Sequence, residues 1–306
     1  MSNDEIKILT ADGEEIIKID DKPSNTRRNE ERKEEDKNYI PVIIKRTDES
    51  FRHPDDILEK AIVEGEEQMS RSAMSLFLSA TAAGLIISFT VMAVAVFTTM
   101  VQNFESEMAQ RVITALVYPL GFVLCILSRT QLFTEHTATA VYPILDRRFP
   151  IKRLFSLWLI IICGSLVGGL ASSQLLVQAD QVIQAYEGYV KIADHLLAYD
   201  SKSLLISAVL AGWLMALAAW ITLSTPSTLS QIVIIYIVTF IIGVGGLHHS
   251  IAGSVEMFVG YFISDNYTIN DVMYFVSHAL TGNLIGGSIF VALLNYGHIR
   301  QTQKND

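Results

Sequence analysis

The stretch YPLGFVLCILSRTQLFTEHTATAVYPIL, residues 118–145, decides the fold, because a short polar interruption separates two apolar pieces. A second stretch, IVIIYIVTFIIGVGGLHHSIAGSVEMFVGYFI over residues 232–263, has the same construction around GGLHHS. Each leading apolar piece is shorter than the roughly 20 residues that a helix needs to cross a bilayer. Short hydrophobic segments with polar or glycine interruptions in corresponding places indicate discontinuous transmembrane helices around a binding site. We therefore predict two helices broken in the middle of the membrane.

Apolar segments elsewhere in the chain bring the number of predicted spans to six. The continuous apolar stretches cover residues 73–101, 112–127, 154–177, 204–223, 232–244 and 279–296. Hydrophobic residues make up 50% of the chain, in keeping with a polytopic protein. The predicted fold class is an all-α membrane protein with six transmembrane helices.

Charged residues are unevenly placed along the chain and set its predicted domains. The net charge is −9, and most charged residues lie within the first 72 positions. Residues 1–53 have few aromatic residues and predict a disordered cytoplasmic tail, while residues 54–72 predict an amphipathic cytoplasmic helix on the membrane surface. Residues 73–300 form the predicted six-helix membrane domain, and 301–306 the cytoplasmic C-terminus. No basic patch indicates nucleic-acid binding, and the N-terminus lacks the apolar region of a cleaved signal peptide.

Lys and Arg residues set the predicted orientation, since cytoplasmic loops of membrane proteins carry an excess of both. The link after the second span holds four of them: Arg147, Arg148, Lys152 and Arg153. The links on the opposite side hold three among several acids: Arg111, Lys191 and Lys202. Both termini are therefore predicted to be cytoplasmic, in a multi-pass protein of the bacterial inner (plasma) membrane.

The chain also repeats itself. SATAAGL at 79–85 is similar to SAVLAGW at 207–213, and GSLVGG at 164–169 is similar to GNLIGG at 282–287. Small residues at four-residue spacing let helices approach closely, so core packing would explain any one motif alone. The matching order of both pairs indicates a duplication. Three spans per half give the halves opposite polarity, which predicts a 3+3 inverted repeat.

Ionisable residues cluster in the two interruptions, where the cost of charge in a bilayer makes each one a functional candidate. They are Arg129, Glu135 and His136 in the first, and His248, His249 and Glu256 in the second. A histidine titrates near neutral pH, and the hydroxyl of Thr134 could fix an imidazole tautomer. Two simpler interpretations remain open: a histidine satisfied within the core, and a structural ion pair between Glu256 and Arg129.

No pattern in the chain predicts an enzyme, a cofactor or a metal site. There is no nucleophile–base pair, no phosphate loop and no metal-ligand spacing in the sequence. Cys125 and Cys163 each lie alone in an apolar span, so we predict two buried small hydrophobic residues rather than a disulfide.

Several of these segments resemble the formate/nitrite transporter family. The resemblance rests on YPLGFVLCILSRTQLFT at 118–134, on HHSIAG and on GNLIGG, and it extends over roughly 74–300. The run RTQLFTEHTATAVYPIL, the SVEMF stretch and the charged tail are more similar to the family's YfdC-like branch than to its formate channels. The resemblance implies an aquaporin-like hourglass protomer with two broken helices, a homopentamer in the lipid bilayer, and transport of a small monocarboxylate or inorganic anion, with H+ as a possible co-substrate.

The resemblance also implies roles for particular residues. His249 is similar to the central pore histidine of the family, and Thr134 to the threonine of the loop in the second helix. Four residues fall where the family has apolar constrictions: Tyr118, Phe122, Met215 and Ile242. An apolar ring opposes a bare anion and passes its neutral acid, so proton-linked transport through His249 is the expected mechanism.

The chain departs from the formate channels at several pore positions. Gly212 and Gly253 stand where those channels carry asparagine, His248 stands where they tend to carry an acid, and Glu135 adds an acid to the other broken helix. Formate itself is therefore one candidate among several small solutes. Two further interpretations stay open: a passive channel for a neutral solute, and a membrane scaffold that acts through its charged tail.

Overall fold

The computed structural model describes residues 54–225 and 227–303. Six of its helical segments are long and apolar enough to cross a membrane: Ala73–Val101, Glu107–Leu127, Ile151–Gln178, Ser201–Ser224, Thr228–Gly245 and Ile269–Thr302. The prediction of an all-helical membrane protein with six spans is thus confirmed. The tail predicted over 1–53 lies outside the described residues.

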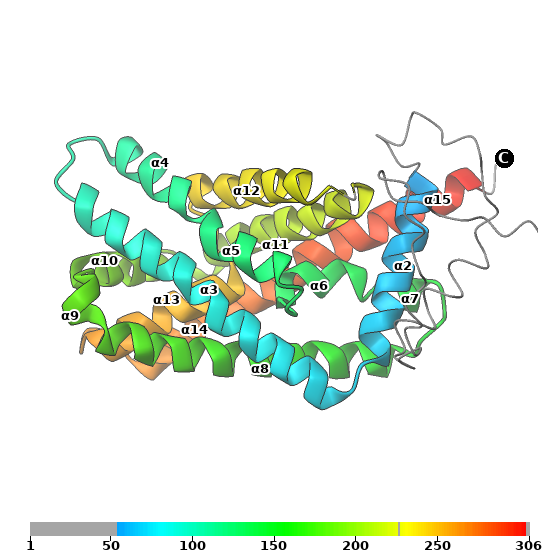
Figure 1. Cartoon of the computed structure of the whole chain (residues 1–306), viewed down its shortest axis with the longest axis horizontal. Coiled ribbons are helices and arrows are strands. Elements are labelled where there is room, and N and C mark those ends of the chain that lie inside the picture. The colour runs from blue at the N-terminus through cyan, green and yellow to red at the C-terminus, as the bar shows by residue number, and fades with distance from the viewer. Residues whose placement is uncertain (1–53, 226, 304–306) are drawn as a thin grey trace, which may run out of the picture. The chain divides into compact units, whose positions relative to one another are not determined.

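The helices of the first half are α2 (Pro54–Ser70), α3 (Ala73–Val101), α4 (Glu107–Val117), α5 (Pro119–Leu127), α6 (Phe133–Thr139), α7 (Tyr142–Leu145) and α8 (Ile151–Gln178). Those of the second half are α9 (Asp180–Ile183), α10 (Tyr186–Leu197), α11 (Ser201–Ser224), α12 (Thr228–Gly245), α13 (Ser250–Ile263), α14 (Ile269–Ile285), the π-helix η1 (Gly286–Leu293) and α15 (Leu294–Gln303). Figure 1 shows α9 and α10 at one end of the long helices, and α2, α7 and α15 at the other.

Both broken helices are interrupted in the same way. The leading piece α5 ends at Leu127 and is followed by Arg129 in the left-handed conformation, with φ of 57°. The leading piece α12 ends at Gly245 and is followed by Gly246, with φ of 60°. A left-handed residue after the last turn commonly ends a helix. The shorter pieces α6 and α13 then begin at Phe133 and Ser250.

The inverted repeat is visible in how the glycines pack. In the first half Gly84 of α3 lies against the backbone of Ser165 in α8, leaving no room for a side chain. In the second half Gly212 of α11 lies in the same way against the backbone of Asn283 in α14. Figure 1 shows α3 running beside α8. The predicted 3+3 repeat is therefore built from two equivalent helix pairs.

The second small-residue motif gives the same correspondence. The Cα of Gly168 faces the backbone of Thr81, and that of Gly286 faces the backbone of Val209. Thr81 and Val209 occupy the same place in SATAAGL and SAVLAGW.

The sixth span is longer than predicted. The apolar pattern predicted 279–296, whereas α14 begins at Ile269. Its first turn is fixed by a capping box, in which Thr268 and Asp271 each bind the other's backbone N–H. Capping of this kind stabilises a helix start that hydropathy does not reveal. The π-helix η1 and the short helices α9 and α10 were not predicted.

The apolar face of α2 packs on protein rather than on a membrane surface. Leu58, Ile62 and their apolar neighbours on α2 form a buried cluster with Tyr142 and with Val291 of η1. The end of α2 is fixed by Arg153, whose guanidinium donates to the carbonyl of Met69 at 2.8 Å. The helix is therefore packed as part of the helical bundle.

The prediction that both cysteines are buried is wrong for one of them. Cys125 is buried, and its thiol lies 3.2 Å from the hydroxyl of Thr130. Cys163 is exposed on α8, on a helix that packs through its other face and leaves large apolar residues such as Leu159 uncovered. Both are free thiols.

Candidate transport pathway

Two buried side chains from the two broken helices meet directly. Thr134 lies in the first turn of α6, and His249 is the residue that caps the N-terminus of α13. The hydroxyl of Thr134 lies 2.7 Å from Nε2 of His249. The side chains are 0% and 1% exposed. The pair singled out in the sequence is thus in hydrogen-bond contact.

The hydrogen bonds of His249 assign its tautomer. The backbone N–H of Ala252 donates to Nδ1 at 3.2 Å, so Nδ1 is an acceptor and the ring proton lies on Nε2, which donates to Thr134. An imidazolium has two donors and no acceptor. Protonation at Nδ1 would therefore break the cap of α13, which favours the neutral ring.

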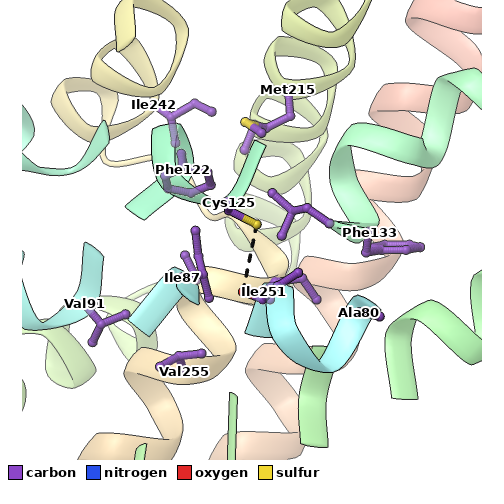
Figure 2. Packing of buried hydrophobic residues seen from close by; sticks show 14 of the residues in the cluster. Ala80, Ile87, Val91, Phe122, Cys125, Phe133, Met215, Ile242, Ile251 and Val255 are labelled. Carbon is purple, nitrogen blue, oxygen red and sulfur yellow. Dashed lines mark hydrogen bonds between the residues drawn. The ribbon is translucent and has the colours of Figure 1, made fainter. Parts of the chain in front are cut away.

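The four predicted constriction residues are all buried near this pair. Tyr118 and Phe122 have ring centroids 5.2 Å apart, and Phe122 meets the ring of His249 edge-on at 4.9 Å. Met215 and Ile242 belong to the same packed cluster. Figure 2 shows Phe122, Met215 and Ile242 on neighbouring helices. Phe122 thus borders the polar pair directly.

A cavity of about 610 Å³ opens beside the apolar side chains, at the end of the molecule where α10 lies. We call it the vestibule. Its lining combines Tyr118 and Ile242 with His249 and with charged or titratable groups from α4, α10 and α13, among them Arg111, His195 and Glu256. It is large enough for a small solute and its water.

A second and smaller cavity, of about 90 Å³, lies between α2 and the first break. We call it the α2 pocket. Its lining includes Arg129, Glu135 and His136. Nε2 of His136 lies 4.0 Å from the carboxylate of Glu135, and its Nδ1 lies 2.6 Å from the amide of Gln68 on α2. All three predicted ionisable residues of the first break therefore line a pocket beside α2.

Glu64 of α2 is the second acid of the α2 pocket. Burial raises the pKa of Glu64, and the positive charges of Arg129 and Lys60 only partly oppose the effect.

The ion pair considered between Glu256 and Arg129 is not formed. Glu256 lines the vestibule, whereas Arg129 lines the α2 pocket. No salt bridge joins them among the described residues. Sequence alone could not separate the two, because both lie in apolar surroundings close to a break.

His248 is held apart from His249 by a separate set of contacts. Its Nδ1 lies 2.8 Å from the hydroxyl of Ser207, which also accepts the backbone N–H of His248 at 3.2 Å. Its ring stacks on His195 of α10 with centroids 6.1 Å apart and planes 18° apart.

Sequence reasoning missed Asn283, which holds the second break in place. Its side-chain oxygen accepts the backbone N–H of Ser250 at 2.8 Å, and its amide donates to the carbonyls of Ala208 and His248 at 2.7 and 3.0 Å. The sequence feature that could have pointed to Asn283 is its position in GNLIGG, because a polar amide is unusual among the small residues at a tight helix contact. Ser207, His195 and Arg111 gave no such signal.

Gly212 and Gly253, where the family resemblance predicts asparagine, are both closely covered by their neighbours. A side chain at Gly212 would meet the backbone of Asn283. A side chain at Gly253 would meet the ring of Phe275, with 2.6 Å from its Cβ to Cε1. An asparagine at either position would require the surrounding helices to move.

Comparison with known proteins decides the family. Residues 55–297 match the sequence profile described as Formate/nitrite transporter. The chain belongs to the formate/nitrite transporter family. It is thus a channel or transporter of that family and not an enzyme, as predicted.

Individual members of the formate/nitrite transporter family resemble the chain over most of its length. The inner membrane protein YfdC of Escherichia coli (strain K12) is 29% identical over 245 residues, which cover 79% of this chain and 77% of YfdC. The resemblance to the YfdC-like branch is therefore confirmed.

Two solved structures share the fold. An FNT family ion channel has a TM-score of 0.70 at 18% identity and covers 80% of this chain and 99% of its own. A pentameric formate channel with formate bound has a TM-score of 0.65 at 21% identity and covers 75% and 98%.

Proposed function

We propose that this formate/nitrite transporter conducts small monovalent anions of weak acids across the membrane, linked to a proton through the site formed by Thr134 and His249. The single observation that carries the proposal is the buried contact of 2.7 Å between the hydroxyl of Thr134 and Nε2 of His249. His249 lines the vestibule together with Tyr118, and Phe122 meets the ring of His249 edge-on.

The physical argument concerns charge in an apolar passage. A bare anion loses its hydration at the apolar side chains, which is costly, while the neutral acid loses far less. In the neutral tautomer the Nε2–H of His249 donates to Thr134, whose own hydroxyl proton is then free to donate to an incoming anion. Donors of this kind stabilise the anion until it takes up a proton from the water of the vestibule, which His249 lines. The species that passes the apolar side chains is then uncharged.

Replacement of His249 by alanine tests the proposal. In proteoliposomes with purified protein, we expect formate and nitrite uptake to increase as the external pH falls from 8 to 5, and to fall at least tenfold in His249→Ala. Uptake of the anion should carry no net charge, as read with a potential-sensitive dye. Unchanged pH-dependent flux in His249→Ala would falsify the proposed role of the histidine.

A panel of solutes separates the alternatives. Formate, acetate, nitrite, hydrosulfide and a small neutral solute are compared at each pH. A passive channel for a neutral solute predicts flux that depends on neither pH nor His249. The buried carboxyl group of Glu256 in the vestibule is the observation that favours this alternative, because an ionised carboxylate there would oppose an anion. If no tested solute is transported, the result favours the third interpretation, a membrane scaffold that acts through its charged tail.

The assembly and location follow from relatives. The similar solved structure is a pentameric formate channel, and the relative YfdC is an inner membrane protein. We extend both properties to this chain: a homopentamer in the bacterial inner membrane, each protomer with its own pathway and both termini cytoplasmic. Size measured with native mass spectrometry in detergent tests the pentamer.

A further inference from the structure

Arg111 of α4 and His195 of α10 converge on one point of the vestibule. Both side chains lie against Gly246, the left-handed residue that ends α12. The position that a Cβ of Gly246 would occupy is 3.1 Å from Nη2 of Arg111 and 3.4 Å from Nε2 of His195. The glycine thus leaves room in which the two groups face the same small volume.

A third nitrogen lies next to these groups. The ring of His248 stacks on that of His195 and is 2% exposed. Its Nδ1 is engaged by Ser207, whereas its Nε2 is buried and has no hydrogen-bond partner among the described residues. A buried polar atom without a partner is costly. The residue lines the vestibule, so a vestibule ligand can satisfy this nitrogen.

Arg111 and His195 both keep donor groups that no other contact in the described part of the chain occupies. Nδ1 of His195 lies 3.4 Å from the hydroxyl of Tyr199, which leaves Nε2 for the vestibule. Arg111 makes no ion pair with a carboxylate within the described part of the chain. An arginine in such a place offers a planar pair of donors suited to two oxygens of one anion.

From this arrangement we infer that Arg111, His195 and His248 form a second anion site, which binds a small planar oxyanion such as a monocarboxylate or nitrite in the vestibule before it reaches His249. Arg111 supplies the charge and a bidentate contact. The two histidines supply nitrogen donors. As a loading site on the transport path it rests on the proposed function, but its occupancy can be measured without transport.

The other charges of the vestibule decide how the site responds to pH. From α4 they include Glu107, from α10 Lys191, and from α13 Glu256. The ammonium of Lys191 is bound to the side-chain oxygen of Gln110 at 2.7 Å. Asp194 of α10 is turned away and accepts a hydrogen bond from Tyr267 at 2.8 Å. His249 lines the same cavity.

Protonation of His195 should strengthen the site. Burial, and then the charge of Arg111, lower the pKa of His195, so this histidine is neutral at pH 7 and gains its proton only in more acid conditions. A bound anion favours the protonated ring and raises its pKa. Anion binding should therefore tighten as the pH falls, and should take up a proton.

Binding is measured on the full-length protein in detergent micelles. Its histidines are labelled with nitrogen-15, and formate, nitrite or chloride is added at pH 5.5 and 7.5. We expect formate and nitrite to shift the ring signals of His195 and His248 with saturation, at least tenfold more tightly at pH 5.5 than at 7.5. Chloride, which cannot make two parallel contacts with a guanidinium, should bind more weakly. Equal binding of all three anions would overturn the assignment to oxyanions.

Arg111→Gln and His195→Gln should each weaken formate and nitrite binding about tenfold, the loss of one charge-assisted contact. Lys191→Gln is the matched control, because it removes one positive charge from the same cavity but not from the site. It should weaken binding much less than Arg111→Gln. If the two variants weaken binding equally, the vestibule attracts anions only through its general charge, and no site exists there.

The result is independent of the proposed transport function. His249→Ala should abolish pH-linked flux and retain the saturable shifts of His195 and His248. Arg111→Gln should raise the half-saturating concentration for formate flux about tenfold. Saturable shifts without flux in the wild type would keep the anion site and overturn the transport proposal. Flux without any shift of the histidine signals would keep the transport proposal and overturn the anion site.

Discussion

The role of the contact between Thr134 and His249 can be tested by removing a single hydroxyl group. Thr134→Val keeps the volume and removes the hydroxyl, which leaves the buried Nε2–H of His249 without its acceptor. An unsatisfied buried donor costs about 1–3 kcal/mol. We expect formate or nitrite flux to fall at least tenfold, with little change in protein yield.

Thr134→Ser is the control for this change, because it restores the hydroxyl. It should recover most of the flux that Thr134→Val loses, as measured in the same proteoliposomes. Equal flux in Thr134→Val and the wild type would show that the hydroxyl takes no part in transport.

Asp146 gives a prediction on pH and stability outside the membrane spans. Burial alone raises its pKa, but hydrogen bonds from Arg148, Tyr296 and Arg300 outweigh burial and hold the pKa below its ordinary value. A carboxylate with a depressed pKa stabilises the fold above its ordinary pKa, near 4, and loses that contribution as the pH falls below it.

Asp146→Asn should therefore lower the melting temperature in detergent at pH 6 by a few degrees. The difference from the wild type should shrink as the pH is lowered toward 3. Asp265→Asn, on an exposed loop residue, is the control and should leave the melting temperature unchanged. A constant difference for Asp146→Asn at every pH would contradict the role of the ionised carboxylate.

Residue types and their positions near a break predicted the pair of Thr134 and His249. They did not predict which residues the other ionisable groups contact. Whether Glu256 faces Arg129 or the vestibule depends on the rotation of α13 against α3 and α10, which no local pattern encodes. The same holds for His195 of α10, which lies between two spans, and for Arg111 of α4, near the start of the second span. Residues brought together from three helices carry no spacing signal in the sequence.

At the scale of elements, the glycine contacts between α3 and α8 and between α11 and α14 are the basis of the repeat. Gly84→Ala and Gly212→Ala each add a methyl group against the backbone of the partner helix. Overpacking of this kind costs about 1–3 kcal/mol. Both variants should lose folded protein and melting temperature to a similar degree, because the two contacts are equivalent.

Gly297→Ala is the matched control, because nothing lies within 4 Å of the added methyl group. In a helix this change removes backbone freedom and should leave the melting temperature unchanged or raise it. A loss confined to only one of Gly84→Ala and Gly212→Ala would argue against equivalent halves.

Element boundaries were predictable where hydropathy changes sharply and unpredictable where capping decides. The predicted spans over 73–101 and 204–223 agree closely with α3 and α11. The start of α14 was missed by ten residues because Thr268 and Asp271 cap a helix whose first turns interrupt their apolar residues with Asn270, Asp271, Ser277 and His278. The sequence predicted that the apolar face of α2 lies on the membrane surface. An amphipathic pattern identifies an apolar face but not whether lipid or protein covers it, and here protein does.

At the scale of the whole molecule, the two cavities differ in histidines rather than in net charge. Each lining has two basic and two acidic residues: Arg111, Lys191, Glu107 and Glu256 in the vestibule, and Lys60, Arg129, Glu64 and Glu135 in the α2 pocket. The vestibule adds three histidines, His195, His248 and His249, and the α2 pocket adds one, His136. An inverted repeat makes the two halves alike in backbone, so this difference comes from side chains alone.

The orientation of that pathway in the membrane is the last prediction. The basic link between α7 and α8 predicts that this end, with both termini, is cytoplasmic, so the vestibule faces the periplasm. In a Cys163→Ser background, Val182→Cys on α9, at a residue that is 87% exposed, should react with a membrane-impermeant maleimide in intact cells. Lys152→Cys, in the basic link, should react only after the cells are permeabilised. Cys125 is buried and should add little background. The opposite labelling pattern would show that the protein has the reverse orientation in the membrane. Arg111 and His195 would then bind anions from the cytoplasm for export.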